Sequence, residues 1–265
     1  MNLFNRARHK EIEYHEKFYA ETNLFQPGSW LSRPVKVVLD NLIHIEKDDI
    51  QVLDLGCGVG RNSIPIAQRI QAYKGKIHCI DLLPSAIQLL SQNAEHYGVT
   101  DTIIAQAADV ENFLINKNTF DYIVACSCLE HVSSEATFQA KLEEMKAGTT
   151  DGGINCILMS TEVKEIDVLT GEEQEGLIEL NLSTEKAFTY LREMYTDWDV
   201  SIEKSVQQEI KEEKNGRAII FRSNWECKLF CVNGFLPKLT QEGFTWRGGH
   251  DRLNCLGDTS LRVIA

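Results

Sequence analysis

The sequence lacks a long hydrophobic run, a Cys-x-x-Cys pair and a block of basic residues. Its first stretch, MNLFNRARHKEIEYHEKF, is charged, so we expect neither a signal peptide nor a membrane span there. The sequence has 27 basic and 39 acidic side chains, which gives a net charge of −12. Because like charges repel, a nucleic-acid backbone or an anionic membrane is disfavoured as a partner.

The positions of the eight cysteines predict free thiols in an apolar core. Several lie in apolar runs such as KIHCID and INCILMS, where a cysteine acts as a small apolar residue. Without paired spacings, the pattern argues against a disulfide framework and against a zinc site. We therefore expect no metal and a reducing, cytoplasmic setting.

Residues 51–160 alternate short apolar runs with helical patterns. Runs rich in Ile, Val and Leu are typical of strands covered on both faces of a sheet. The pattern predicts an α/β fold with a doubly wound, mostly parallel sheet. The expected strands are QVLDL, KIHCID, TIIAQAA, FDYIVACS and DGGINCILMS; the helices are SIPIAQRIQAY, PSAIQLLSQNAEHYG and SEATFQAKLEEMKAG, the last capped by Ser134.

Outside this region the pattern changes. Thr161–Leu180 holds seven acids and one lysine, and its weak periodicity predicts an exposed loop. A helix capped by Ser183 or Thr184 follows, and two strands around Asn215-Gly216 predict an antiparallel C-terminal hairpin. The first 48 residues contain two helical patterns. In the second, Ser32 is the expected cap, and the apolar face is Val35, Val38, Leu39, Leu42 and Ile43.

The stretch QVLDLGCGVGRNSIPIAQRI places glycines at 56, 58 and 60 between a strand and a helix. Bare backbone at this position lets a ligand approach closely, at the sheet edge where open α/β sheets bind nucleotides. A dinucleotide fingerprint needs a third glycine where Arg61 stands, and no Gly-Lys-Ser/Thr of a phosphate loop follows. A tight turn without a ligand is the remaining structural alternative.

VLDLGCGVGRN resembles the first motif of class I S-adenosylmethionine-dependent methyltransferases. Further matches follow in order over residues 35–231. Asp81 resembles the acid that accepts hydrogen bonds from both ribose hydroxyls, although it could instead cap the next helix. Asp109-Val110 resembles the pair that binds adenine, and FDYIVACSCLEHV resembles the strand under the methionine part. The resemblance implies a seven-stranded sheet with its last strand antiparallel, and S-adenosyl-L-methionine as cofactor. The cofactor-binding residues it implies are Asp54, Gly56, Cys57, Gly58, Gly60, Arg61, Asn62, Asp81, Leu82, Asp109, Val110, Cys126 and Ser127.

Methyl transfer from a sulfonium depends on alignment of the two reactants more than on acid catalysis. The residues that bind the substrate are therefore harder to predict from the sequence. Glu130 and His131, after the fourth strand, are the candidates for substrate contact, with His131 a candidate base because its ordinary pKa is near 6.5. A structural role for this histidine is the alternative. Other candidates are Tyr14, Tyr19 and Arg222.

The stretch STEKAFTYLREMYTDWDV resembles the C-terminal half of the TehB-type tellurite-resistance methyltransferases. The matching residues are Leu191, Arg192, Tyr195 and Trp198, and Arg217 falls near an arginine of that family. This resemblance implies Arg192 and Arg217 as ligands of an oxyanion such as tellurite or selenite. Two departures count against it: Glu209-Ile210-Lys211-Glu212 replaces a His-Arg pair, and the acidic stretch Thr161–Leu180 lies nearby.

We therefore predict an N-terminal helical lid at residues 1–33, a methyltransferase domain at 34–231 and a C-terminal extension of unknown role at 232–265. The expected partner is a small-molecule methyl acceptor. Alternatives are an N-, O- or S-methyltransferase of other specificity and a non-catalytic S-adenosylmethionine-binding protein. An enzyme that methylates base amines is disfavoured, since CSCLEH stands where such enzymes carry [ND]-P-P-[YF].

Overall fold

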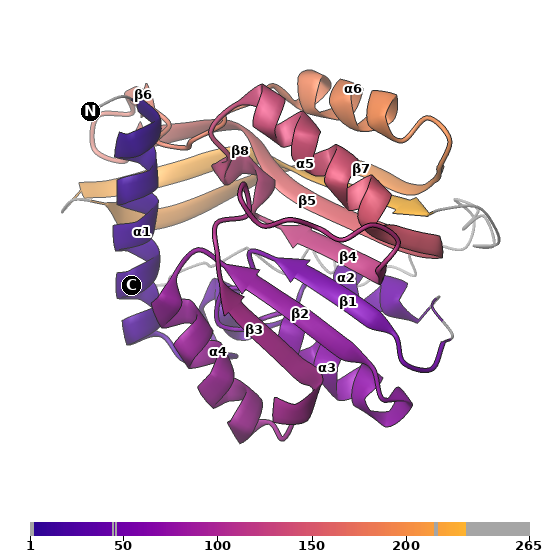
Figure 1. Ribbon diagram of the computed structural model, residues 1–265. Coiled ribbons are helices and arrows are strands. Elements are labelled where there is room, and N and C mark those ends of the chain that lie inside the picture. Colours follow the sequence, from indigo (N-terminus) through magenta and orange to yellow (C-terminus); the bar gives the residue numbers. More distant parts are fainter. Residues whose placement is uncertain (1–2, 44, 46, 215–216, 232–265) are drawn as a thin grey trace, which may run out of the picture.

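One mixed β-sheet organises the chain, with helices on both of its faces (Figure 1). The computed structural model describes residues 3–43, 45, 47–214 and 217–231, with the backbone alone for 174–175, 212–214, 217 and 225–231. Seven strands form the order β3-β2-β1-β4-β5-β8-β7. Their bounds are β1 Gln51–Leu55, β2 Lys76–Asp81, β3 Ile103–Ala107, β4 Phe120–Cys126, β5 Thr149–Asp167, β7 Asp199–Lys214 and β8 Arg217–Cys231.

The parallel half of the sheet confirms the α/β prediction. β1 pairs in parallel with β2 and β4, β2 pairs with β3, and β4 pairs with β5. Side chains of β1 from Val52 to Leu55 are buried, as a sheet covered on both faces requires. The carboxyl ends of the central strands therefore meet at one edge, where the glycine turn follows β1.

Two apolar cores lie on opposite faces of the sheet. The first packs α2 (Lys36–Leu42), α3 (Ser63–Ile70) and α4 (Pro84–His96) against it. The second packs α5 (Glu135–Gly148) and α6 (Thr184–Met194). The caps predicted for the last two helices are confirmed: Ser134 accepts a hydrogen bond from the Thr137 amide, and Ser183 from the Lys186 amide.

The C-terminal half supports the antiparallel hairpin but corrects the predicted loop. β8 pairs antiparallel with both β5 and β7. Asn215 and Gly216 themselves lie outside the described residues, as does the extension at 232–265. Thr161–Leu180 is not one loop, because β5 continues to Asp167 and the short strand β6 (Glu173–Glu175) pairs with it. The alternation was hidden because Glu165 and Asp167 occupy buried positions of the strand.

The N-terminal segment contains α1 (Leu3–Glu21), which stands across the carboxyl edge of the sheet (Figure 1). The predicted second helix is shorter than expected. It starts at Lys36 with Val35 at its cap position, so Ser32 is not the cap. Val35, Val38 and Leu42 are buried as predicted, whereas Ile43 is exposed. None of the helices in the described part of the chain combines the length and apolar character needed to cross a bilayer.

Candidate functional site

Two adjoining cavities lie between α1 and the carboxyl edge of the sheet, and they share Gly56, Ser127 and His131. We call the first the β2 cavity, because its wall includes the end of β2 from Ile80 to Leu83. The second, the β5 cavity, is lined by the end of β4, by Ser160 of β5 and by side chains of β7 and β8. Ligands of open α/β sheets bind at this edge.

The glycines of the turn have two roles: Gly56 and Gly58 leave space for a ligand, and Gly60 allows close packing. Gly56, with a φ of +70°, lines both cavities, and Gly58, with a φ of +51°, lines the β5 cavity. A Cβ on Gly58 would lie 2.7 Å from the Tyr19 hydroxyl, so only bare backbone fits under α1. Gly60 lines neither cavity. Its Cβ would meet Leu90 Cδ1 at 2.6 Å, so this glycine allows α3 and α4 to pack closely.

Asp81 ends β2 and faces the β2 cavity. Its Oδ2 accepts a hydrogen bond from the Gly58 amide at 2.8 Å, and its Oδ1 accepts one from the Leu83 amide at 2.9 Å. The carboxylate thus braces the glycine turn and also caps the start of α4. Burial raises its pKa, against the lowering effect of these two amides. A carboxylate has about four acceptor positions, so both oxygens remain able to accept from a diol.

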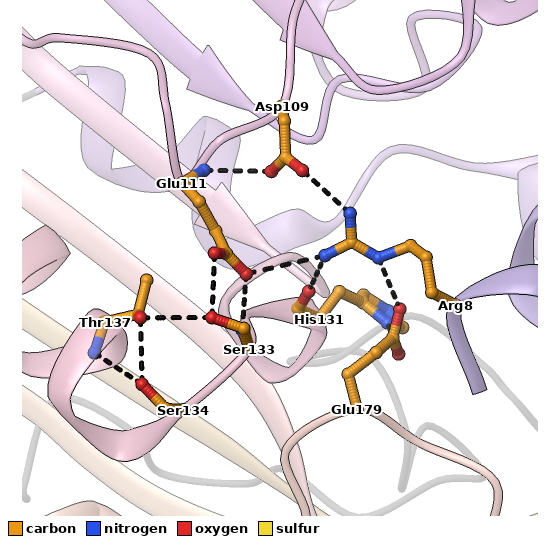
Figure 2. A network of polar contacts seen from close by, with 8 residues as sticks. All are labelled: Arg8, Asp109, Glu111, His131, Ser133, Ser134, Thr137 and Glu179. Carbon is orange, nitrogen blue, oxygen red and sulfur yellow. Dashed lines mark hydrogen bonds and ion pairs between the residues drawn. The ribbon is translucent and has the colours of Figure 1, made fainter. Parts of the chain in front are cut away.

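Asp109 reaches the same cavity from the end of β3, together with Leu82 and Val110. It is held by Arg8 of α1, whose Nη1 lies 2.8 Å from Asp109 Oδ2. Figure 2 shows that Arg8 also contacts Glu179, at 2.9 Å, and the carbonyl of His131. Glu111 lies 3.6 Å from the same guanidinium. One arginine therefore ties α1 to three separate segments around the site.

His131, which lines both cavities, forms an ion pair with Glu179, which lines the β2 cavity. The imidazole Nδ1 lies 2.8 Å from Glu179 Oε2. Burial alone would lower the pKa of His131, but the hydrogen bond and charge of Glu179 outweigh it and raise that pKa to about 9. The pKa of Glu179 is correspondingly lowered, despite its burial. At neutral pH this histidine is an imidazolium, which argues against the general-base role expected for it.

Glu130 is the buried acid of the β5 cavity, with 2% of its surface exposed. Its Oε1 accepts a hydrogen bond from the Ser160 amide at 2.9 Å. Its Oε2 has no hydrogen-bond partner among the residues that the structure describes. Burial raises the pKa of this carboxyl.

The remaining cofactor candidates separate into two groups. Asp54 is buried away from both cavities, where it accepts a 2.6 Å hydrogen bond from the Ser63 hydroxyl. Burial raises its pKa to about 7. Five other candidates line the β5 cavity: Cys57, Arg61, Asn62, Cys126 and Ser127.

The arginine candidates whose side chains the structure describes, Arg192 and Arg222, do not line the cavities. Arg192 lies on the exposed face of α6, paired with Glu203. Arg222 pairs with Glu209 at 2.7 Å and lines neither cavity. The Arg217 side chain lies outside the described residues. Tyr195 and Trp198 are buried in the core beside α5, so their match reflects packing.

Sequence reasoning missed most of the wall that α1 contributes. Arg8, Glu11 and His15 were missed, and they line the cavities from one face of this helix together with Tyr19. Their spacing of three or four residues places them on one stripe, but a polar stripe is also typical of a solvated helix surface. The candidates Tyr14 and Tyr19 both line the β5 cavity. Glu179 was missed because it comes from the stretch that we predicted as an exposed loop.

The residues fit a nucleoside with a charged tail: bare turn backbone, a diol-facing acid, and an acid beside an apolar residue converge on the β2 cavity. Residues 52–153 match the family model described as "Methyltransferase domain". Residues 52–153 thus carry a methyltransferase domain. S-Adenosyl-L-methionine is the cofactor of such domains. Among the described residues, no group of three or more His, Cys, Asp or Glu side chains is arranged to hold a metal ion.

The fold of the methyltransferase domain recurs in solved structures. TehB from Haemophilus influenzae is 21% identical, with a TM-score of 0.54 over 74% of this chain and 61% of that one. YcgJ from Bacillus subtilis is 12% identical, with a TM-score of 0.53 over 75% of this chain and 99% of its own. These likenesses show the fold alone.

A curated relative matches a shorter part of the methyltransferase domain. Norajmaline N-methyltransferase from Rauvolfia serpentina is 28% identical over 87 residues, 33% of this chain and 29% of the relative. The chain thus spans less than a third of that relative and less than two thirds of TehB.

Proposed function

We propose that this chain is an enzyme that transfers a methyl group from S-adenosylmethionine to a small molecule. The observation that carries the proposal is the convergence of Gly56, Asp81 and Asp109 on one cavity at the carboxyl edge of the sheet. The match of residues 52–153 to a methyltransferase domain supports it independently. The closed wall that α1 makes over this edge favours a small acceptor over a polymer.

In this proposal each part of the site has a binding task. Asp81 accepts hydrogen bonds from the ribose hydroxyls, while Asp109 and Val110 hold the adenine. The backbone of Gly56 and Gly58 leaves room for the chain that carries the sulfonium. The donor, once bound, supplies a methyl group on a positively charged sulfur. Because the sulfur leaves as a neutral thioether, it needs no acid catalyst.

The acceptor then occupies the β5 cavity, beside Glu130 and His131. Alignment of two bound reactants lowers a barrier by roughly 7–11 kcal/mol, so positioning is the main task of these walls. We assign to residues 1–33 the role of a lid, because α1 supplies Arg8 and Tyr19 to the closed side of the site. The free thiols of Cys57, Cys79 and Cys128 support a reducing, cytoplasmic setting.

Tellurite or a related oxyanion is the acceptor suggested by the sequence resemblance to TehB-type enzymes; the solved TehB, at 21% identity, shares the fold. The site offers little for a doubly charged anion. Arg192 pairs with Glu203 on the surface, and Glu11 and Glu130 line the β5 cavity. Tellurite is therefore one acceptor class among several to be tried.

The test is turnover of the whole chain with S-adenosylmethionine and a panel of amines, thiols, alcohols, tellurite and selenite. We expect S-adenosylhomocysteine to accumulate above the rate without acceptor for at least one class. Mass spectrometry then locates the added methyl group. Cofactor binding with no product from any class, including a metabolite extract, would contradict the proposal and favour a non-catalytic binding protein.

A further inference from the structure

We infer that the acceptor is an amine and that Glu130 is the residue that binds it and takes up its proton. This inference rests on the proposed methyltransferase function and adds the substrate class. It starts from one atom. Glu130 Oε2 is buried, and among the described residues nothing donates a hydrogen bond to it. A buried carboxylate oxygen without a donor is costly, so a ligand that brings one gains affinity there.

The position of Glu130 separates it from the nucleoside end of the methyl donor. The residue lines the β5 cavity and not the β2 cavity, where Asp81 and Asp109 lie. The cofactor candidates Cys126 and Ser127 also line the β5 cavity, so the methionine end of the donor and the acceptor meet there in this inference. Its other oxygen is anchored to the Ser160 amide of β5, which holds the carboxyl toward the β5 side. Its own carbonyl accepts from the Leu180 amide, so the backbone is fixed as well.

The surroundings of Glu130 favour a cationic ligand with an apolar body. Glu11 adds a second carboxylate to the cavity. The imidazolium of His131 is compensated by Glu179 at 2.8 Å, and Arg61 points to the Arg33 carbonyl and the Trp30 ring. Apolar and aromatic side chains complete the wall: Tyr14, Trp30, Ile178, Ile210 and Phe221.

The chemistry separates an amine from other acceptors. An alkylammonium has a pKa of about 10 and must lose a proton before its nitrogen can attack, whereas a thiol of pKa about 8.5 reacts as an anion that two carboxylates repel. The ammonium passes one proton to Glu130 Oε2. The nitrogen lone pair then forms the new N–C bond while the C–S bond breaks, and sulfur keeps that electron pair as a neutral thioether. The methylated ammonium leaves, and Glu130 returns its proton to solvent.

The test compares three forms of the full chain: wild type, Glu130→Gln and the control Glu165→Gln. Glutamine keeps the shape and the bond to the Ser160 amide but cannot take a proton. Glu165 is a matched control, because it is a buried acid of β5 that lines neither cavity. The probes are alkylamines with aliphatic or aromatic frames, each with the thiol and alcohol of the same carbon frame, and tellurite. Calorimetry measures S-adenosylmethionine affinity for every form.

We expect the amines to be the preferred probes of the wild type. Glu130→Gln should lower kcat/KM for them by roughly 10- to 100-fold, the range for losing a hydrogen bond to a charged group. It should leave cofactor affinity unchanged, and Glu165→Gln should resemble the wild type.

If the wild type prefers a thiol, an alcohol or tellurite, and Glu130→Gln leaves kcat/KM unchanged, the inference is overturned. The proposed function would still stand. A loss of cofactor affinity in Glu130→Gln shows instead that this acid binds the ammonium of the methionine tail. Absence of product from every probe, with cofactor bound, contradicts the proposed function itself.

Discussion

At the scale of single residues, burial and pairing give the acids and histidines of the site different states. Asp54 is buried without a cation, and its pKa rises to about 7. His131 is only partly buried, and the carboxylate of Glu179 raises its pKa to about 9. Pairing with an acid therefore decides the state of this histidine. A histidine predicted from its ordinary pKa to be a base is thus turned into a fixed cation.

The ion pair of His131 and Glu179 should stabilise the fold only within a window of pH. The pKa of His131 is raised on folding, so its contribution is complete below about 6.5 and disappears as the pH rises through about 9. The pKa of Glu179 is lowered on folding, so its contribution is lost in acid. A double-mutant cycle of His131→Gln and Glu179→Gln, measured by urea unfolding, should give a coupling of about 2–3 kcal/mol near pH 6.

The same cycle at pH 10 should show almost no coupling. The exposed pair of Lys164 and Glu173, 3.2 Å apart, is the control and should contribute below about 1 kcal/mol at both values. A His131–Glu179 coupling that is equal at pH 6 and pH 10 would contradict the charged state assigned to the imidazole.

At the scale of elements, α1 decides how far the site is closed. Its inward stripe carries Arg8, His15 and Tyr19, while Lys10 pairs with Glu13 within the helix. Arg8 is the strongest attachment, since it contacts Asp109, Glu179 and the His131 carbonyl. Without it, Asp109 and Glu111 would lose the cation that lies between them, while Glu179 would keep His131.

Arg8→Met should therefore loosen α1 from the edge of the sheet. Charged hydrogen bonds contribute about 1.5–3 kcal/mol each, so we expect amide exchange in Ile12–Tyr19 to accelerate about tenfold or more. Exchange in β1 and β4 should not change. Lys10→Met is the matched control on the same helix and should leave all rates as in the wild type. Equal protection in both variants would show that this arginine does not hold the lid.

The sequence predicted those elements in which a single requirement, such as burial on both faces, determined the residue types. Strands covered on both faces had to be apolar, Pro84 marked the start of α4 and Ser134 capped α5, so β1 to β4 and these helices were predictable. Two features were not. The end of β5 buries Glu165 and Asp167, which erases the apolar alternation. The site wall from α1 is polar on its inner face, so its stripe resembled a solvated helix surface.

At the scale of the whole molecule, topology brings together residues that are distant in sequence. The strand order places the ends of β1, β2 and β4 side by side, and the crossing of α1 adds the N-terminal segment to them. Glu179 then reaches the same place from the segment after β6. The glycine turn and its acids could be predicted from local patterns, whereas Arg8 and Glu179 depend on long-range packing that no local pattern records.

The central claim is that this edge of the sheet binds S-adenosylmethionine through Asp81. Calorimetric titration of the cofactor onto wild type, Asp81→Ala and the exposed control Asp151→Asn tests it most directly, with thermal unfolding to verify each fold. We expect the wild type and the control to bind alike, and Asp81→Ala to remain folded but bind at least roughly 100-fold more weakly, as for two lost hydrogen bonds to a charged group. Unchanged affinity in a folded Asp81→Ala variant would contradict the account.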